Sequence, residues 1–322
     1  MSKASISVAL CTFNGARHLQ AQLESIASQT LLPDELVVCD DGSHDTTVEI
    51  VTCFSASAPF QIHLTVNPRN LGSTKNFERA ISLCQGDIIA LCDQDDVWNK
   101  DKLRQIKSAF EAHPEAGAVF SDAEIVNELL QPLGYRLWQR YGFAPGLQRK
   151  MEKGKPFDVL LRQNVVTGTT FAFRSNFRQN ILPIPECWIH DAWVALIIAA
   201  LAKLIFVADP LVQYRQHSDN QIGGLKPGFR SWFASVFRDN SENYLAHVNQ
   251  LILARDRLPS SKNAPPMSYI RKLESKIHHF QVRGSMPENR IRRLPRVVKE
   301  LLSLRYFQFS NGCMSFAKDL LH

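Results

Sequence analysis

Three carboxylates stand directly after an apolar run in the first third of the chain. Residues 88–92 read Ile-Ile-Ala-Leu-Cys, and Asp93, Asp95 and Asp96 follow them. At the carboxyl end of a buried strand, such residues lie on the edge where open α/β sheets bind ligands. Clustered carboxylates suit a hard cation, Mg²⁺ or Mn²⁺, and a turn at Asp95 would let Asp95 and Asp96 face one ion. The alternative is a helix cap by Asp96 or Asn99, although a cap accounts for only one carboxylate.

Two more groups with chemical capacity occur later in the chain. Asp191, preceded by His190, stands at the start of an apolar segment of helical length. A carboxylate there can act as a general base if an attacking hydroxyl comes within hydrogen-bond reach, and it can equally cap the helix. His217 follows a strand-like segment and is a candidate ligand for a metal or a phosphate. An ordinary histidine at a strand end is the alternative.

Thr12 and Asp41 follow the first two strand-like segments and could bond to the edge of a pyrimidine base. The alternative is turn chemistry, because Asp41-Gly42-Ser43 favours a turn in any protein. The phosphate-binding patterns GxxxxGK and GxGxxG are both missing from the sequence, which counts against an ATPase and a dinucleotide oxidoreductase. A diphosphate would then be held by a carboxylate-bound metal, which also makes it a better leaving group.

The elements that must position these groups repeat as a strand and then a helix. Four strands are expected over residues 6–10, 35–39, 61–66 and 87–92, and each ends in polar or acidic residues. Helices are expected around Leu19, Leu23 and Ile26 and over residues 46–54, 74–84 and 100–112. Continuous apolar strands of this kind are typical of a parallel sheet covered on both faces. The sequence therefore predicts a doubly wound, mostly parallel α/β sheet.

The pattern is less regular in the second half of the chain. We expect strands over residues 117–120, 165–174, 204–208 and 211–215, and helices over residues 157–162 and 192–202. Residues 128–155 contain Gly, Pro, Trp and Tyr without a period, which indicates an irregular segment that could form part of an acceptor-binding wall. We place the α/β domain at residues 1–222 and a basic, mainly helical extension at residues 223–322.

Composition favours a globular protein with reduced cysteines. The chain has 322 residues, of which 45% are hydrophobic. Neither an 18-residue charge-free apolar run nor a basic N-terminal head with a cleavage site occurs, so we predict a cytoplasmic protein. None of the seven cysteines forms a CxxC pair, and we expect Cys11, Cys39 and Cys92 to be reduced core residues.

Six motifs follow one another in a fixed order between residues 4 and 222. In the N-terminal half they are Thr12-Phe13-Asn14 and residues 38–43, 67–72 and 92–98. Together they resemble family 2 glycosyltransferases with the GT-A fold. Residues 188–193 and 214–217 resemble the acceptor-side segments of the branch that includes bacterial rhamnosyltransferases of cell-surface polysaccharides.

This resemblance implies roles for individual residues of the donor site. Asp93 and Asp95 match the DxD motif, with Asp95 as the direct metal ligand, and His217 falls where some members place a residue on the diphosphate or the metal. The cofactor would be Mg²⁺ or Mn²⁺. The residues that would contact the nucleotide sugar are Thr12, Asn14, Asp41, Arg69, Asn70, Asp93 and His217.

On the acceptor side, the resemblance makes Asp191 the catalytic base. Many family members have Glu-Asp where this chain has His190-Asp191, so the role of His190 stays open. The QxxRW signature of processive members is missing, which implies transfer of a single sugar.

The positive charge of the chain lies in its C-terminal part. Residues 271–322 carry 11 Lys or Arg and 4 Asp or Glu, whereas the preceding residues carry 26 and 27. Residues 290–307 predict a basic amphipathic helix that could lie at the inner face of the cell membrane or dock on the catalytic domain. Nucleic acid is disfavoured as a partner, because no aromatic-rich binding motif accompanies the charge. The apolar positions of this helix are Leu294, Val298, Leu301, Leu302 and Leu304.

The sequence thus predicts an inverting glycosyltransferase of cell-surface polysaccharide synthesis. It would move a sugar from dTDP-rhamnose or a UDP-hexose to a saccharide or a lipid-linked saccharide. A sugar-phosphate nucleotidyltransferase is one alternative, but it should carry a glycine-rich basic loop where this chain has Thr12-Phe13-Asn14-Gly15. A non-catalytic protein that binds nucleotide sugars is the other, and it would not need the base carboxylate.

Overall fold

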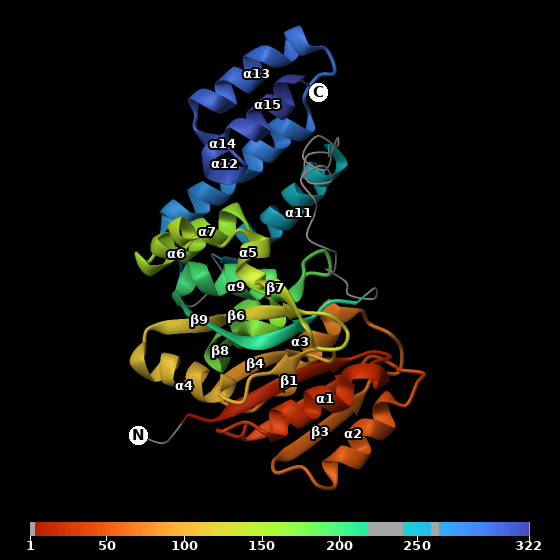
Figure 1. Cartoon of the computed structure of the whole chain (residues 1–322). Coiled ribbons are helices and arrows are strands. Elements are labelled where there is room, and N and C mark those ends of the chain that lie inside the picture. The colour runs from red at the N-terminus through yellow and green to blue at the C-terminus, as the bar shows by residue number, and fades with distance from the viewer. Residues whose placement is uncertain (1–3, 218–240, 259–263, 322) are drawn as a thin grey trace. The chain divides into compact units, whose positions relative to one another are not determined.

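The computed structural model describes residues 4–217, 241–258 and 264–321 (Figure 1). The chain divides into two compact units, Met1–Pro156 with Val165–Gly223, and Phe157–Asn164 with Gly224–His322. The predicted domain boundary between residues 222 and 223 lies outside the described residues.

Four parallel strands form one half of the sheet in the first unit. Strand β1 lies between β2 and β4, and β3 follows β2. Every residue of β1 and β2 is buried, as expected for parallel strands that are covered on both faces. These strands are β1 (Ile6–Thr12), β2 (Glu35–Asp40), β3 (Gln61–Val66) and β4 (Ile88–Asp93).

A helix follows each of these strands, so the predicted strand-and-helix repeat is confirmed. The helices are α1 (Ala16–Ala27), α2 (Thr47–Ser55), α3 (Ser73–Leu83) and α4 (Lys102–Ala112). Leu19, Leu23 and Ile26 of α1 are fully buried, since their spacing places them on one face of the helix. The polar ends of β1 to β4 consequently lie on one edge of the sheet.

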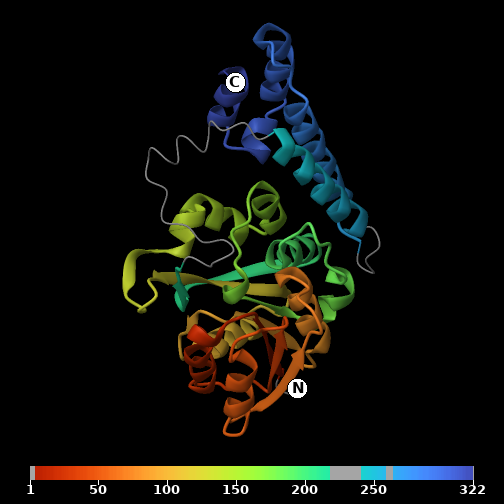
Figure 2. The same ribbon diagram turned by 90° about the vertical axis from the view of Figure 1, so that its right-hand side faces the viewer.

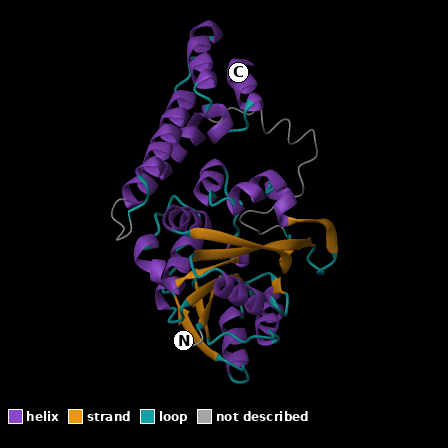
Figure 3. Ribbon diagram, turned by 90° about the vertical axis from the view of Figure 1, so that its left-hand side faces the viewer, coloured by secondary structure: helices purple, strands orange, loops and turns teal. Residues whose placement is uncertain are grey.

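Five further strands complete the sheet: β5 (Val97–Trp98), β6 (Ala116–Val126), β7 (Pro132–Arg136), β8 (Phe171–Arg174) and β9 (Lys203–Arg215). The full order is β3-β2-β1-β4-β8-β6-β9-β5, with β7 paired to β6. Strand β8 is antiparallel to both β4 and β6, whereas β6 and β9 are parallel. The predicted α/β class with a mostly parallel sheet is confirmed, and the described strands all belong to this unit (Figure 3).

Several boundaries predicted for the second half are wrong. Residues 204–215 form the single strand β9, in which the expected break at Asp209 and Pro210 is a register shift against Ser121 and Asp122. Residues 128–155 are more regular than expected, because they contain β7, α5 (Leu137–Tyr141) and α6 (Pro145–Glu152).

The segment expected as a strand over residues 165–174 contains the 3₁₀ turn η1 (Gly168–Thr170) before β8. Two further short helical pieces, η2 (Ser175–Phe177) and α8 (Arg178–Ile181), follow β8. The apolar helix α9 (His190–Leu201) matches its prediction closely. Its mid-section is buried all round, which explains why it reads as continuous apolar sequence.

The second unit is helical in its described residues. Helices α11 (Ser241–Arg257) and α12 (Met267–Gly284) pack side by side (Figure 2), and α7 (Pro156–Arg162) contributes Phe157, which stacks on Tyr269 of α12. The remaining helices are α13 (Arg290–Leu302), α14 (Arg305–Phe309) and α15 (Cys313–Leu321). The predicted helix over residues 290–307 is therefore two helices, separated at Leu304, whose φ is +59°.

Buried ion pairs hold the second unit together. Arg283 donates two hydrogen bonds to Asp319, and the Tyr306 hydroxyl donates a third to the same carboxylate. Glu300 pairs with His279 at 2.6 Å and with Arg305 at 2.7 Å. None of the helices in the described residues is long and apolar enough to cross a bilayer.

The cysteine prediction is confirmed. All seven cysteines are free, and Cys11, Cys39 and Cys92 are buried in the strands of the sheet.

Candidate active site

The ends of β1 and β2 are tied together by the carboxylate of Asp40. Thr12 is buried, and its hydroxyl donates a 2.8 Å hydrogen bond to Asp40. The same carboxylate accepts from the backbone N–H groups of Gly42 and Ser43, so it closes the turn after β2. The turn chemistry considered for this stretch is therefore present, and it is carried by Asp40 as well as by Asp41.

Asp41 organises the loop that follows β3. Its Oδ1 accepts from the Asn67 side chain at 2.7 Å and from the Leu71 N–H at 2.8 Å, and its Oδ2 accepts from the Gly72 N–H at 2.9 Å. Only 2% of Asp41 is exposed, whereas Arg69 and Asn70 of the loop are exposed. Asp41 thus holds in place a loop that presents Arg69 and Asn70.

Asn14 and Gln94 fix the loop between β1 and α1. Asn14 has φ +47°, its N–H donates to the Ser43 hydroxyl, and its side-chain oxygen accepts from the His44 N–H. The Gln94 amide accepts from Phe13 N–H at 2.8 Å and donates to Phe13 C=O at 3.0 Å. A Cβ at Gly15 would come within 2.2 Å of Gln94 Oε1, so a larger residue there would displace the Gln94 amide from Phe13. Sequence reasoning missed Gln94, because a glutamine between two aspartates carries no signal of such a contact.

The carboxylates after β4 have separate environments. Burial, and after it the negative charges of Asp95 and Asp191, raise the pKa of Asp93 to about 7. Asp95 pairs with His217, whose Nε2 lies 2.8 Å from Asp95 Oδ2. The structure therefore brings Asp93, Asp95 and Asp191 close enough for their charges to interact, with His217 in contact with Asp95.

The carboxylate of Asp96 contacts strand β9. It is fully buried and its Oδ1 accepts from the backbone N–H of Arg215, so it fastens β9 to this turn. Burial first, and the charge of Asp95 second, raise its pKa well above the usual value. That Asp95 and Asp96 face one ion stays a prediction, because the contact with Arg215 engages only Oδ1 of Asp96. The capping alternative is wrong for Asp96, since α4 begins after Asp101.

Lys102 is a second residue that sequence reasoning missed. It is fully buried, its ammonium group donates to the Thr169 carbonyl, and it lies 3.3 Å from the centre of the Trp98 ring. Burial lowers the pKa of Lys102 to about 7, against the opposing attraction of Asp96 and Asp93. A lysine in the first turn of an amphipathic helix normally predicts a solvated face, and only the tertiary structure shows otherwise.

Asp191 lies in the first turn of α9, and only one of its two carboxylate oxygens has a hydrogen-bond partner in the described residues. Its Oδ2 accepts the Gly168 N–H at 2.8 Å, while its buried Oδ1 has no hydrogen-bond partner among the residues that the structure describes. Burial raises the pKa of Asp191 to about 6, although hydrogen bonds from the Gly168 and Ala192 N–H groups oppose this shift. A buried carboxylate oxygen without a hydrogen-bond partner can accept a proton from a hydroxyl that binds within hydrogen-bond reach.

Gly168 joins Asp93, His190 and Asp191. A Cβ at this position would lie 2.9 Å from His190 Nε2 and 3.7 Å from Asp93 Oδ2. The His190 ring stacks on Phe77 with a 3.8 Å centroid separation, and within the described chain neither ring nitrogen has a hydrogen-bond partner. Burial lowers the pKa of His190 to about 3, so the ring is neutral at ordinary pH.

The residues fit a divalent cation that a diphosphate helps to bind. Over the part of the chain that the structure describes, no cluster of three or more Asp, Glu, His or Cys side chains forms a metal cage. Mg²⁺ and its analogues are commonly held by one or two carboxylates, with substrate phosphates and water completing the shell, so Asp93 and Asp95 are sufficient. The mutual repulsion that raises the pKa of Asp93 is also what a bound cation would relieve. His217 contacts Asp95 and would orient this ligand.

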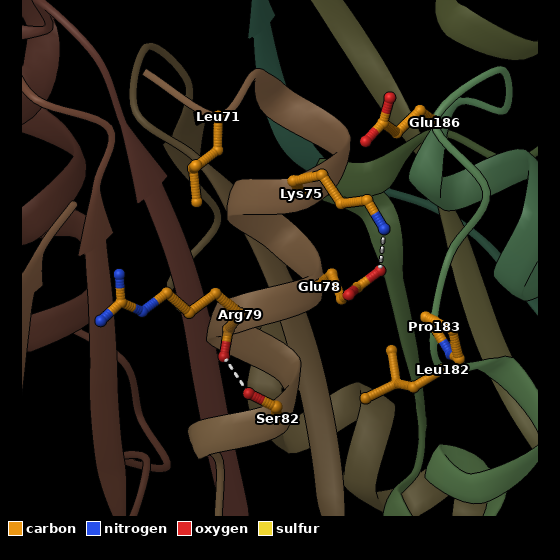
Figure 4. Close-up of a pocket in the computed structure, with 8 residues that line it drawn as sticks. All are labelled: Leu71, Lys75, Glu78, Arg79, Ser82, Leu182, Pro183 and Glu186. Carbon is orange, nitrogen blue, oxygen red and sulfur yellow. Dashed lines mark hydrogen bonds and ion pairs between the residues drawn. The ribbon is translucent and has the colours of Figure 1, made fainter. Parts of the chain in front are cut away.

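An open groove of about 640 Å³ lies beside α3, away from these carboxylates (Figure 4). Lys75 and Glu78 of α3 form a 2.9 Å ion pair there, and Glu78 also accepts from the Ile184 N–H. Lys75 and Glu78 thus bind each other and the backbone of Ile184. The lining residues are Leu71, Lys75, Glu78, Arg79, Ser82, Leu182, Pro183 and Glu186.

Comparison with known proteins identifies the family. The family model for glycosyl transferase family 2 matches residues 7–176, which include β1 to β4 and Asp93 to Asp95. The chain belongs to glycosyltransferase family 2. Its carboxylate cluster and the polar strand ends lie within the matched range, whereas Asp191 and His217 lie beyond it.

Similar proteins that are named as glycosyltransferases support this assignment. An uncharacterised glycosyltransferase of Nostoc sp. is 32% identical over 226 residues, 67% of this chain and 66% of that protein. The dTDP-rhamnosyl transferase RfbG of Shigella flexneri is 27% identical over 223 residues, 66% of this chain and 73% of that protein. The aligned part thus spans about two thirds of the Nostoc relative's length.

Solved structures share the fold of this family 2 chain. S. aureus TarS 1-349 in complex with UDP-GlcNAc has a TM-score of 0.59 and 14% identity, over 98% of this chain and 89% of that one. The mannosyltransferase PcManGT of Pyrobaculum calidifontis, in complex with GDP-Man and Mn²⁺, has a TM-score of 0.53 and 16% identity, over 98% and 79%. The GT-A fold predicted from the motifs is confirmed.

Proposed function

We propose that this protein transfers a sugar, with inversion, from a nucleotide-activated donor to a hydroxyl of a saccharide or lipid-linked saccharide. The observation that carries the proposal is Oδ1 of Asp191, which is buried without a hydrogen-bond partner in the described residues, while the Gly168 N–H holds Oδ2 and Asp93 lies nearby. Membership of glycosyltransferase family 2 supplies the reaction class. The acceptors we have in view are intermediates of cell-surface polysaccharide synthesis.

In the proposed reaction, Asp191 removes the proton from the acceptor hydroxyl. The acceptor oxygen forms a bond to the anomeric carbon while the bond from that carbon to the diphosphate oxygen breaks, so the electron pair leaves with the nucleoside diphosphate. A single in-line displacement inverts the anomeric centre. The Gly168 N–H keeps Asp191 Oδ2 engaged, which orients Oδ1 toward the hydroxyl.

Asp95 and Asp93 would hold Mg²⁺ or Mn²⁺, which when bound neutralises the diphosphate and stabilises it as a leaving group. His217 would keep the Asp95 carboxylate oriented through their 2.8 Å contact. Among the structural neighbours, the PcManGT complex supports a divalent metal cofactor because it contains Mn²⁺.

The nucleotide would lie against the ends of β1, β2 and β3. Thr12, Asn14 and Asp41 shape the two loops there, and the exposed Arg69 and Asn70 are available to the diphosphate and the ribose. We infer dTDP-rhamnose or a UDP-hexose as donor. The name of RfbG supports the first, and the UDP-GlcNAc complex of TarS supports the second.

A thermal-shift panel tests the donor half of the proposal. The panel contains dTDP-rhamnose, several UDP-hexoses and GDP-mannose, each with Mn²⁺, Mg²⁺ or a chelator. A ligand that binds only the native state raises the melting temperature, so the correct donor should give a metal-dependent shift. Asp95→Ala should remove the metal dependence. Absence of a shift with every nucleotide sugar, and with free UDP, dTDP and GDP, would contradict the proposal.

A further inference from the structure

Helix α13 of the second unit presents an apolar stripe to solvent. Ile291, Leu294, Val298 and Leu302 recur every three or four residues and therefore lie on one face of the helix. They are 82%, 47%, 39% and 78% exposed. Leu304 and Phe307, at and after the end of α13, are also exposed and continue the apolar surface. Scattered exposed leucines are ordinary, but a contiguous stripe of this kind marks an interaction site.

The opposite face of α13 packs through polar groups. Its buried residues are Arg293, Val297 and Glu300, and two of these three are charged. Arg293 donates to the Asp319 and Pro287 carbonyls, and Glu300 pairs with His279. The helix lies against α14 and α15 in this way (Figure 1). The apolar stripe therefore is not needed to fold the unit, and folding alone gives no reason for its composition.

A row of cations accompanies the stripe. Arg290, Arg292, Arg296 and Lys299 are exposed on α13, and the single acidic residue of the helix, Glu300, is buried and paired. The accessible surface of α13 is thus apolar and basic, with no exposed anion of its own. A second copy of this face would bring like charges together, whereas anionic lipid headgroups complement them.

We propose that this surface of α13, formed by Ile291, Leu294, Val298 and Leu302 with Arg290, Arg292, Arg296 and Lys299, docks on an anionic lipid bilayer. The aliphatic side chains insert at the boundary between headgroups and acyl chains, and the basic side chains pair with the headgroup phosphates. On the inner face of a cell membrane, this docking would hold the enzyme near lipid-linked acceptors. That consequence rests on the proposed transfer reaction, but the docking itself requires neither donor nor metal.

Co-sedimentation of the full chain with vesicles tests this proposal. Vesicles of phosphatidylcholine mixed with phosphatidylglycerol should bind the protein, and added salt should weaken this binding. Vesicles of phosphatidylcholine alone should bind the protein much less. Ile291→Ser with Leu302→Ser should lower the partition coefficient by about tenfold or more, because both side chains lose apolar contact with the bilayer. Leu129→Ser with Leu245→Ser is the matched control, since these leucines are 78% and 52% exposed elsewhere.

A second pair of variants tests the charge contribution. Arg292→Glu with Lys299→Glu should lower binding to the anionic vesicles by at least about thirtyfold, because each lost cation costs roughly 1 kcal/mol and each new carboxylate adds repulsion. Lys153→Glu with Lys155→Glu changes the net charge equally at exposed positions just after α6 and should leave binding nearly unchanged. The donor-induced thermal shift should be the same in all four variants, so failure of docking can be told apart from failure of the transferase proposal.

Three outcomes would overturn the proposal. One is absence of binding to the anionic vesicles, and another is equal binding by the α13 variants and their controls. The third is a dimer, seen by light scattering without vesicles, that Ile291→Ser with Leu302→Ser dissociates, since a second copy would then be what covers the stripe.

Discussion

The carboxylates at the ends of β2 and those around β4 and α9 differ in how their oxygens are used. Asp41 accepts three hydrogen bonds from the loop it organises. Asp191 accepts the Gly168 N–H through one oxygen, and its other oxygen has no hydrogen-bond partner in the described residues. Burial raises the pKa values of Asp191 and Asp93. In the first region the carboxylate of Asp41 stabilises a loop, whereas in the second Asp93 and Asp191 are buried carboxylates with raised pKa values, as is common at ligand-binding and catalytic sites. Residues of one type thus divide between shaping a site and acting in it.

The largest effect is expected at Asp191. Asp191→Asn keeps the size of the side chain but cannot accept a proton at neutral pH, so single-turnover transfer should fall by about a thousandfold. The donor-induced thermal shift should persist, because donor contacts lie elsewhere. Asp209→Asn, an exposed aspartate of β9, is the control. Near-normal turnover in Asp191→Asn would show that another group is the base.

Gly168 provides the next largest effect, because it sets the spacing within the second region. The added methyl group of Gly168→Ala would meet His190 Nε2 at 2.9 Å, and the His190 ring is fixed by its stack on Phe77. We expect a loss of about a hundredfold in transfer from the displaced carboxylates, with a fall of about 1–3 kcal/mol in the free energy of unfolding. Gly146→Ala in α6, where an added methyl group meets nothing within 4 Å, is the control for the substitution. Unchanged transfer would mean that this spacing has no functional role.

Asp41→Asn tests the structural side of the comparison. The new amide group would face backbone N–H donors, leaving one or more of the Leu71 and Gly72 N–H groups unpaired. The free energy of unfolding should fall by about 2 kcal/mol, as measured by denaturant titration. Donor affinity should weaken through the displaced Arg69 loop, while transfer from saturating donor should change little. A loss of turnover at saturating donor with normal stability would place Asp41 in the chemistry instead.

The sequence predicted the first region more fully than the second. Continuous apolar runs that end in Asp40 or Asp93 identify parallel strands and their edge, because burial on both faces leaves few other patterns. Roles inside the cluster could not be read in this way. The direction of Asp96 depends on Arg215, 119 residues later, and the burial of Lys102 depends on Thr169.

The strands β6 and β9 show the same limit at the level of the fold. Ser121 and Asp122 of β6, and Asp209 and Pro210 of β9, look like strand ends in a local reading. In the structure Ser121 pairs with Val207 and Asp122 with Pro210 across a register shift, and both strands continue beyond it. Local propensity cannot predict this, since the pairing joins residues more than 80 positions apart.

The smallest expected effect is that of pH on the transfer rate, and it can distinguish the role of Asp191 from that of Asp93. A base must be ionised to accept a proton, so a carboxyl with a pKa of about 6 should support transfer at pH 7 and above and lose it as the pH falls. Single-turnover transfer should be about tenfold slower near pH 5 than near pH 7. Asp93, whose pKa is about 7 in the absence of a cation, could produce a similar decline by losing the metal. The two causes respond differently to metal concentration, because excess metal restores Asp93 to its ionised form but leaves Asp191 protonated. A decline that persists at saturating metal and donor therefore assigns the pH dependence to Asp191, and one that disappears assigns it to metal binding.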